Sequence, residues 1–451
     1  MSKKHQDEIY EANAVNEKQT DISPEPVYSP DPARAERIRW WQKARFGALI
    51  IAGPGDIYEW GSGGHHIAWG KPWKVIEDRI RELSYSDYNP KRIARQIKDA
   101  GFKYVVCTVK HHEGFCYWDT ATTDFKITNT PYGEDMVRQL CEALRAEGLP
   151  VGIYLSAWDW SRREYRGVPK EASNLLEQKW GVTTEEGNAL WPKFLDFYYA
   201  QVEELLTNYG RIDVFWLDGG GRGPGIHDPN WDPKRMWDLV RRLQPQCLLN
   251  DRWAGGKNSD FFTYENRVAG TDPGVPWETC HSSHRGGWFY RSWPYYTTKE
   301  LIAMLIESVA KNGNLLLGMS LDPWGKFPDD AVEQMSEIGQ WLKVNGESIY
   351  GCRGTPHQCG PYGWITRKDG HIYLHVLPDQ HKVSQPLQVM GLATVDVRSV
   401  KLLGTGQELD FAPQERDLMV YFPAGFTADP LVTVVDLKVM EPYHWDYYIL
   451  P

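Results

Sequence analysis

The sequence predicts an α/β fold, a (β/α)8-like (TIM-type) barrel followed by a C-terminal antiparallel β-sandwich. Between residues 36 and 350, apolar runs of strand length alternate with amphipathic stretches of helix length, which is typical of a parallel sheet covered on both faces. After residue 350, shorter runs alternate apolar and polar residues between turn signals, which is typical of a sandwich. A chain of 451 residues is long enough for both domains.

The repeating unit of the first domain is a strand followed by a helix. The predicted strands are FGALIIAG (46–53), YVVCTVK (104–110), PVGIYLSAWDW (150–160), IDVFWLDGGG (212–221), QCLLNDR (246–252) and NLLLGMS (314–320). The predicted helices cover residues 89–101, 133–148, 190–209, 232–243, 297–313 and 328–348. A doubly wound open sheet is the alternative fold, but no GxGxxG phosphate fingerprint follows the first strand. The barrel is therefore the leading prediction.

Two further segments flank the barrel. Residues 1–35 are charged and rich in proline (PEPVYSPDP), which predicts a polar N-terminal arm. The alternating runs HIYLHVLP, ATVDVRSVKLLG, DLMVYFPAG and PLVTVVDLKV predict the strands of the sandwich. We therefore expect an arm over residues 1–35, a barrel over 36–350 and a sandwich over 351–451.

Charge and hydropathy limit the kinds of partner. A net charge of -10 and an isoelectric point of about 5.8 argue against nucleic acid and anionic membranes. No stretch approaches the roughly 20 apolar residues of a membrane span, and the polar N-terminus lacks the apolar core of a signal peptide. The seven cysteines form no CxxC pair, so we expect reduced thiols and a cytoplasmic location. The number of subunits stays open, with a homo-oligomer among the options.

The aromatic content is high, with 21 tryptophans and 24 tyrosines. Sugar sites commonly combine aromatic platforms with fixed hydrogen-bond partners. A tryptophan-rich core would explain the same composition. The count therefore raises a carbohydrate hypothesis without deciding it.

Polar side chains gather where the predicted strands end. They are Lys110, His111, His112 and Glu113 on one strand, Tyr154, Trp158, Asp159 and Trp160 on the next, Trp216 and Asp218 on the third, and Asp251, Arg252 and Trp253 on the fourth. Because the reactive groups of a barrel lie at the C-terminal ends of its strands, we expect these residues to share one pocket.

The adjacent histidines His111 and His112 suggest metal ligation first. Neighbours in a regular strand face opposite ways, so one metal could take both only if the strand breaks there. Zinc sites more often use helical or turn spacing, and no matching third ligand is evident. We therefore predict no metal and no cofactor, and expect the imidazoles to bind sugar hydroxyls. A core histidine with its hydrogen bonds satisfied remains the alternative for either one.

Asp218 is the sharpest candidate for chemistry. It stands in WLDGGG, where the glycines leave room for a ligand. A carboxylate there can act as a nucleophile at an anomeric carbon or as a base. An aspartate before glycine is also a common turn, so the signal comes from its position at a strand end.

Taken together, these segments resemble glycoside hydrolase family 29, the retaining α-L-fucosidases, over roughly residues 40–350. The matching segments are KHHEGFCYW (110–118), GIYLSAWDW (152–160), YGRIDVFWLDG (209–219), NDRW (250–253), DFFTYE (260–265), WETC (277–280), KNGNLLLGMSLDPWG (311–325) and WLKVNGESIYG (341–351). Members of this family also carry a C-terminal β-sandwich.

The resemblance implies a role for each candidate residue. Asp218 would be the nucleophile and Glu265 the general acid and base, with the carboxyl groups about 5–5.5 Å apart. Glu278, in WETC, is the rival for the acid/base role. His111, His112, Tyr154 and Trp216 would line the sugar subsite, with Arg252 and Trp253 nearby. The implied substrate is an oligosaccharide or small glycoside.

The first strand departs from the family pattern. The family reads RFG-x-FIHWG, with its histidine bonded to the sugar, whereas this chain reads RFGALIIAG and places Ile51 and Ala52 there. A sugar hydroxyl left without its partner costs on the order of 1–3 kcal/mol. The segment EWGSGGHHIAWGKPW (59–73) contains Trp60, His65 and His66. We add Trp60 and His66 to the candidate substrate-binding residues, and either histidine could replace the missing one.

These changes lead to three hypotheses for function. The first is a retaining exo-glycosidase that removes terminal α-L-fucosyl residues. The second is the same chemistry on another sugar, such as an α-L-galactoside. The third is a non-catalytic carbohydrate-binding protein, which the presence of both Asp218 and Glu265 disfavours.

Overall fold

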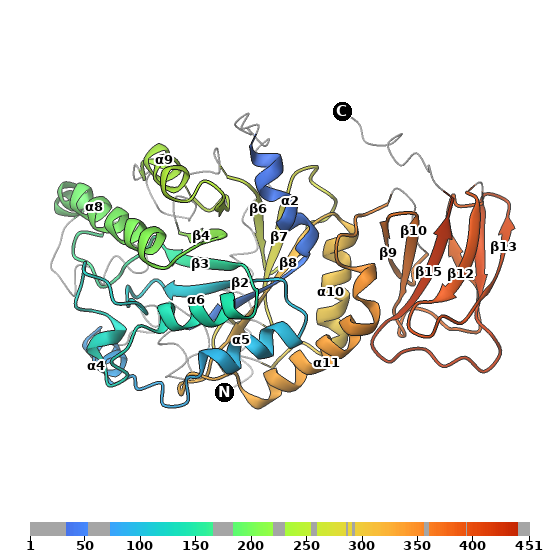
Figure 1. Ribbon diagram of the computed structural model, residues 1–451, viewed down its shortest axis with the longest axis horizontal. Helices are drawn as coiled ribbons and strands as arrows, with labels where there is room; N and C mark the ends of the chain where they lie inside the picture. Colours follow the sequence, from blue (N-terminus) through green and yellow to red (C-terminus); the bar gives the residue numbers. More distant parts are fainter. Residues whose placement is uncertain are drawn as a thin grey trace.

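The computed structural model describes residues 33–52, 73–165, 184–219, 231–253, 259–285, 287–290, 294–355, 360–393 and 395–440. These residues form a parallel sheet surrounded by helices and, next to helices α10 (Thr298–Ala310) and α11 (Asp329–Asn345), two antiparallel sheets (Figure 1). Most of the predicted N-terminal arm and the candidates Trp60, His65 and His66 lie outside the described residues.

The first sheet has eight parallel strands in the order β5-β4-β3-β2-β1-β8-β7-β6. Their bounds are β1 Phe46–Ile51, β2 Tyr104–Lys110, β3 Val151–Ser156, β4 Val214–Asp218, β5 Leu248–Leu249, β6 Phe262–Glu265, β7 Trp277–Ser282 and β8 Asn314–Ser320. A parallel bridge between Asn250 and Phe261 joins the two ends of this order. The sheet thus closes on itself, and the predicted (β/α)8-like barrel is confirmed.

Alternate residues of the strands face the inside and the outside of the barrel. On β1, Ala48 and Ile50 pack in the outer core with the helices, whereas Leu49 and Ile51 belong to the inner cluster. Both sides are buried, which explains why β1, β2, β3 and β8 read as continuous apolar runs.

Helix α2 (Arg34–Ala44) closes one end of the barrel. Its Ile38 and Trp41 join the inner cluster, and the Trp41 ring stacks on Phe261 at 4.5 Å. The Trp41 carbonyl accepts a hydrogen bond from Asn314 at the start of β8 (2.8 Å). Because α2 leads into the start of β1, this closed end is opposite the C-terminal ends of the strands.

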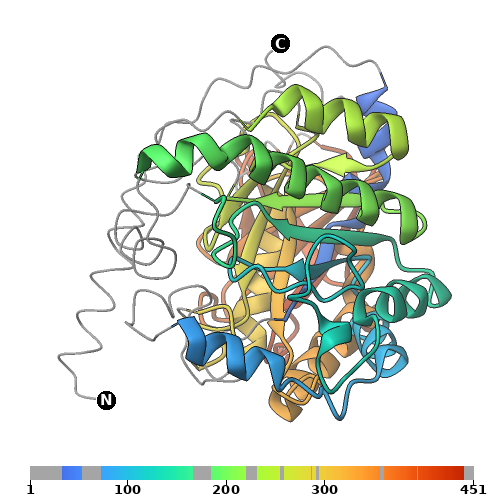
Figure 2. The ribbon, with the colours of Figure 1, turned by 90° about the vertical axis from the view of Figure 1, so that its left-hand side faces the viewer.

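The remaining helices surround the barrel. They are α4 (Trp73–Arg81), α5 (Pro90–Asp99), α6 (Met136–Ala146), α8 (Thr184–Asn208) and α9 (Pro233–Leu243), with α10 and α11 beside the sandwich. In Figure 2, α8 and α9 lie on one side of the barrel, and α5 and α11 on the opposite side. The caps follow the sequence, since Asn89 and Asp135 accept a backbone N–H in the first turns of α5 and α6.

Strands β6 and β7 are absent from the sequence-based prediction. Their sequences, FTYE and WETCHS, carry no apolar run, and no helix separates β5, β6 and β7 among the described residues. The alternation of apolar strands and helices, on which the prediction rests, therefore does not extend to the polar strands β6 and β7 that complete the barrel. Both strands carry glutamates that matter for the site.

The C-terminal part contains sheets in the orders β12-β15-β10-β9 and β11-β14-β13. Their strands are β9 Gly363–Lys368, β10 His371–Val376, β11 Leu387–Val389, β12 Val397–Leu402, β13 Asp410–Gln414, β14 Asp417–Tyr421 and β15 Thr433–Val439. Every described pairing within them is antiparallel, and a shared apolar cluster joins the sheets, so the predicted sandwich is confirmed. The boundary near residue 350 stays a prediction.

Candidate active site

The site is built around Asp218, the last residue of β4. Tyr154 of β3 donates its hydroxyl to Asp218 Oδ2 at 2.7 Å, and the backbone N–H of Gly219 donates to Oδ1 at 3.0 Å. The Asp218 side chain keeps 19% of its surface exposed. The carboxylate is therefore held on both oxygens and still reachable by a ligand.

Arg252 joins Asp218 to Glu265, the last residue of β6. One guanidinium nitrogen, Nη1, lies 3.3 Å from Asp218 Oδ1 and 2.6 Å from Glu265 Oε2. Since both oxygens contact the same nitrogen, they cannot be more than about 6 Å apart. This limit accommodates the separation of about 5–5.5 Å expected of a retaining pair of carboxyl groups. Glu265 is 43% exposed, so a leaving group can reach it.

The two histidines lie directly after β2 ends at Lys110. Their rings are 4.1 Å apart, because the strand breaks there and both can turn toward the site. His111 stacks parallel to Tyr154 at 5.6 Å. His112 Nε2 lies 4.0 Å from Asp218 Oδ2, and its Nδ1 is 2.6 Å from Ser156 Oγ.

The surroundings of Asp218 favour its ionised form. Burial alone would raise its pKa, but the charge of Arg252, the nearby His112 and the Tyr154 hydroxyl outweigh burial and lower the pKa of Asp218 below its usual value. An ionised, partly exposed carboxylate at the end of a barrel strand is suited to act as a nucleophile.

Trp216 lies beneath the side chains of Asp218, Tyr154 and Arg252. Its ring stacks on Tyr154 at 5.3 Å and lies 5.3 Å from the Arg252 guanidinium. On the other side its indole N–H donates to Glu278 Oε1 at 2.7 Å. Trp216 therefore separates the Asp218 centre from Glu278.

Glu278 is sealed inside the barrel. It is fully buried, and Tyr104 donates to its Oε2 at 3.0 Å while Thr263 lies 3.4 Å from Oε1. Thr263 is paired with Glu278 and precedes Glu265 by two residues, which places Glu278 about 7 Å deeper in the barrel than Glu265. The structure thus groups Glu265, and not Glu278, with Asp218.

Glu278 should make the stability of the protein depend on pH. Burial raises its pKa to about 7, although three hydrogen-bond donors act in the opposite direction. A raised carboxyl pKa means that the folded state holds a proton that the unfolded state releases, so stability falls as pH rises from the ordinary value of 4.5 toward 7. The loss is roughly 3 kcal/mol.

The variant Glu278→Gln tests this, because glutamine resembles the protonated acid and does not titrate. We expect urea unfolding at about pH 8 to favour the variant over the wild type by more than at about pH 5. Parallel curves for the two proteins at both pH values would contradict a buried acid at this position.

Comparison with known proteins now decides the family. The sequence profile of the Alpha-L-fucosidase family matches residues 19–347. The chain belongs to this family. It is 27% identical over 419 residues to tissue alpha-L-fucosidase of Rattus norvegicus, covering 85% of each chain. Alpha-L-fucosidase isoenzyme 1 from Paenibacillus thiaminolyticus is 31% identical with a TM-score of 0.82, covering 91% of this chain and 100% of that one. Thermotoga maritima alpha-fucosidase, solved in complex with fucose, is 26% identical with a TM-score of 0.73 and the same coverage.

The departure from the family pattern at the end of β1 places Ile51 in the inner cluster of the barrel and Ala52 in the outer core. Ile51 and Ala52 are both buried, and Ile51 pairs with Ser320 of β8. A side chain added at Gly318 would meet the Trp288 ring at 2.7 Å and Ile51 at 3.0 Å, so Trp288 lies against this position. An aromatic ring therefore lies against Ile51. This chain has isoleucine at the position where the family pattern has histidine.

Other sequence-predicted residues lie apart from the centre. Trp253 is buried, and its described ring contacts are with Tyr198, Tyr199 and Trp231. It turns into the outer core because the apolar ring finds a packed aromatic cluster there. The candidates Trp60 and His66 lie outside the described residues.

The structure also adds Ser156 and Phe289, which the sequence did not assign to the site. Ser156 and the predicted Trp158 contact His112, and Phe289 meets the His111 ring edge-on at 5.4 Å. Ser156 belongs to the quoted segment GIYLSAWDW, so that motif carried a signal for it. Phe289 follows β7 in a stretch with no recognised pattern.

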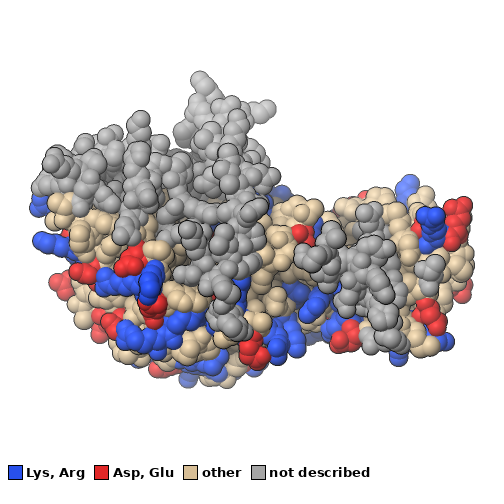
Figure 3. Space-filling model, turned by 90° about the horizontal axis from the view of Figure 1, so that it is seen from above, with Lys and Arg blue, Asp and Glu red and all other residues tan. Residues whose placement is uncertain are grey.

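Metal-ligand clusters and membrane-spanning helices are both absent from the described part of the chain. It contains no group of three or more His, Cys, Asp or Glu side chains placed to hold a metal ion. None of its helices is long and apolar enough to span a bilayer. On the face seen in Figure 3, basic and acidic residues are interspersed over barrel and sandwich.

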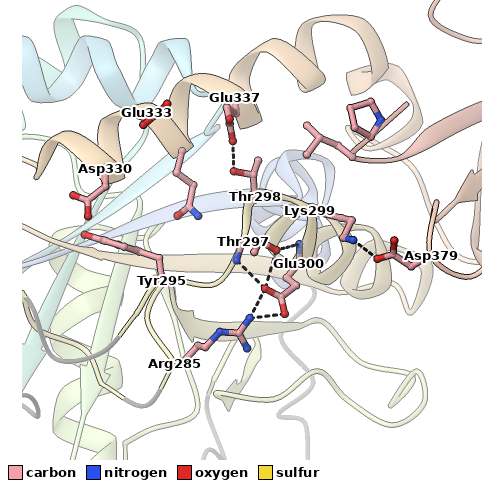
Figure 4. Close-up of a pocket in the computed structure, with 13 residues that line it drawn as sticks. Arg285, Tyr295, Thr297, Thr298, Lys299, Glu300, Asp330, Glu333, Glu337 and Asp379 are labelled. Atoms are coloured by element: carbon pink, nitrogen blue, oxygen red, sulfur yellow. Dashed lines mark hydrogen bonds and ion pairs between the residues drawn. The ribbon is translucent and has the colours of Figure 1, made fainter. Parts of the chain in front are cut away.

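A separate cavity of about 720 Å³ lies where α10 and α11 meet the sandwich (Figure 4). Two ion pairs border it, Arg285 with Glu300 and Lys299 with Asp379. Its lining contains none of the residues around Asp218. Lys299 on α10 and Asp379 after β10 belong to different domains, so this cavity marks the domain junction.

Proposed function

We propose that the protein is a retaining exo-α-L-fucosidase that releases terminal α-L-fucosyl residues from oligosaccharides or small glycosides. The observation that carries the proposal is the placement of Asp218 and Glu265 on one arginine nitrogen, within about 6 Å of each other. Membership of the alpha-L-fucosidase family supports the choice of sugar.

In the first step, ionised Asp218 attacks the anomeric carbon and forms a glycosyl ester while the bond to the leaving oxygen breaks. Protonated Glu265 gives its proton to that oxygen, so the departing group leaves as an alcohol. Tyr154 and Arg252 hold the Asp218 oxygens and aim the nucleophile.

In the second step, Glu265 acts as a base and takes a proton from water as the water attacks the same carbon. The ester bond breaks, Asp218 is freed as a carboxylate, and Glu265 is protonated again. Two displacements at one carbon return the original anomeric configuration. The imidazoles of His111 and His112, beside Asp218, would bind sugar hydroxyls.

The proposed specificity includes a choice between two similar sugars, fucose and L-galactose. Fucose and L-galactose differ at C6, where galactose carries an additional hydroxyl. Ile51, at the family's histidine position, offers the sugar no side-chain hydrogen bond, so the end of β1 does not by itself favour either sugar. Membership of the alpha-L-fucosidase family supports the fucoside, and a site that holds the C6 methyl of fucose would leave the additional galactose hydroxyl unpaired, which costs about 1–3 kcal/mol. The cytoplasmic location stays a prediction.

The test compares release of p-nitrophenol from the α-L-fucoside and the α-L-galactoside. We expect kcat/KM for the fucoside to be higher by a factor of about 5 to 150, and NMR to detect the α-anomer of fucose as the first product. Turnover of the galactoside alone would reassign the sugar. Binding of fucose without turnover of either compound would point to the non-catalytic alternative.

A further inference from the structure

A buried ion pair lies directly beneath the histidines. Lys110, the last residue of β2, and Asp159, which follows β3, are both fully buried, with Nζ 3.1 Å from Oδ2. Lys110 also donates to Gln201 Oε1 on α8 at 2.8 Å. Removing two charges from water is costly, so a buried ion pair is weak evidence for added stability, and a role in fixing a conformation is a hypothesis to test.

The pair interlocks the segments that follow β2 and β3. The second oxygen of Asp159 accepts hydrogen bonds from the backbone N–H and the hydroxyl of Ser161 (3.1 and 2.5 Å). A side chain at Gly114 would come within 2.0 Å of this oxygen, and Gly114 has a φ of +81°. The sequences KHHEGF and SAWDWS therefore fit together through Asp159.

His112 is held between these two segments. Its carbonyl accepts a hydrogen bond from the Trp160 N–H at 2.9 Å, and its Nδ1 lies 2.6 Å from Ser156 Oγ. The Trp158 ring is 4.7 Å from the imidazole. Each of these contacts comes from the segment that Asp159 anchors to Lys110.

We propose that the Lys110–Asp159 ion pair is a positioning device that sets the orientation of His112 toward Asp218. Both side chains are fully buried, so neither touches substrate, and they are positioning residues. The proposal rests on the proposed function, because it assigns the pair an effect on sugar binding and on the nucleophile. The structure supplies a direct link, since His112 Nε2 lies 4.0 Å from Asp218 Oδ2.

The experiment uses the double variant Lys110→Met/Asp159→Asn in the full chain. Removing both charges avoids the isolated buried charge that either single variant would leave. We expect the double variant to fold and its kcat/KM on p-nitrophenyl α-L-fucoside to fall about 100-fold, as expected for a misplaced active-site group. KM should rise, and the acidic limb of the pH profile should move to higher pH, because a displaced His112 no longer favours ionised Asp218.

The groups that act on Asp218 besides His112 are His111, Tyr154, Arg252 and, through Arg252, Glu265. Tyr198 also interacts with the charge of Asp218, and its ring lies 5.3 Å from Lys110 Nζ. Burial raises the pKa of Tyr198 well above its usual value, so Tyr198 stays neutral over the acidic limb.

A matched control is Asp260→Asn. Asp260 is a fully buried carboxylate paired with Arg37 and Arg241 at the start of β6. This variant should lose stability while KM and the pH profile stay as in the wild type.

Two outcomes would overturn the proposal. The first is a folded double variant with wild-type KM and pH profile. If the double variant does not fold, Gln201→Met decides, because it keeps both charges and removes one contact of Lys110. The second outcome that would overturn the proposal is a Gln201→Met variant with the KM and the acidic limb of the pH profile of the wild type. An inactive wild type would instead refute the proposed function, so the two failures are distinguishable.

Discussion

Replacing Asp218 with glycine should lower turnover of p-nitrophenyl α-L-fucoside at least about 1,000-fold, because the covalent step loses its nucleophile. The fold should survive, since Asp218 lies at a strand end and 19% of its side chain is exposed. The measurement is kcat for the purified variant beside the wild type, with circular dichroism to show that both are folded.

Azide distinguishes a lost nucleophile from general damage. A small anion can enter the space vacated by Asp218 and attack the anomeric carbon directly, giving the β-fucosyl azide in a single displacement. Asp260→Asn, which alters a buried carboxylate far from the site, should retain activity and form no azide product. Full activity of Asp218→Gly would remove this residue from the mechanism.

Replacing Glu265 with alanine should reduce kcat by about 10² to 10⁴, the range typical of a lost general acid and base. The loss should be greater for a natural disaccharide than for the p-nitrophenyl glycoside, because nitrophenolate leaves without a proton. Added azide should restore turnover and give the α-fucosyl azide, since it attacks the ester formed with Asp218. The identity of the azide anomer is read by NMR.

Glu278→Gln is the matched comparison for this assignment. Glu278 lies beneath Trp216 and is fully buried, so we expect its variant to keep activity on both substrates and to show no rescue. The opposite result, with Glu278→Gln impaired and rescued by azide and Glu265→Ala active, would transfer the acid/base role to Glu278. A pKa of about 7 would suit that role, which makes the comparison informative in either direction.

In the proposed mechanism, Arg252 couples the two carboxylates Asp218 and Glu265. Its Nη1 contacts both Asp218 and Glu265, and the attraction lowers the cost of placing two acids side by side. When Asp218 becomes an uncharged ester, the arginine retains only Glu265 as a charged partner. The electrostatic surroundings of Glu265 therefore change between the two steps of the reaction, as its change from acid to base requires.

Much of the site follows from local sequence. The strands that contain Tyr154 and Asp218 are fully or largely buried, so their apolar runs identify them and their ends. Because strand ends of a barrel converge, the residues after those runs could be placed together without coordinates. The same reasoning located His111 and His112. The barrel and the sandwich were predicted from the patterns of apolar residues along the chain.

The resemblance assigned the acid/base role to Glu265 with Glu278 as its rival, and only the tertiary structure shows the different depths of the two side chains. Both follow aromatic or hydroxylated residues in polar strands that the sequence pattern does not reveal, so their depth in the barrel could not be counted from a known strand start. Each residue advances a strand by about 3.3 Å. A difference of two positions therefore separates the accessible carboxyl group of Glu265 from the buried one of Glu278. Trp253 was likewise settled by packing, since its ring found an aromatic cluster with Tyr198 and Trp231. The sequence determines which residues stand at the C-terminal ends of the barrel strands. Long-range packing determines which of their side chains face the site around Asp218.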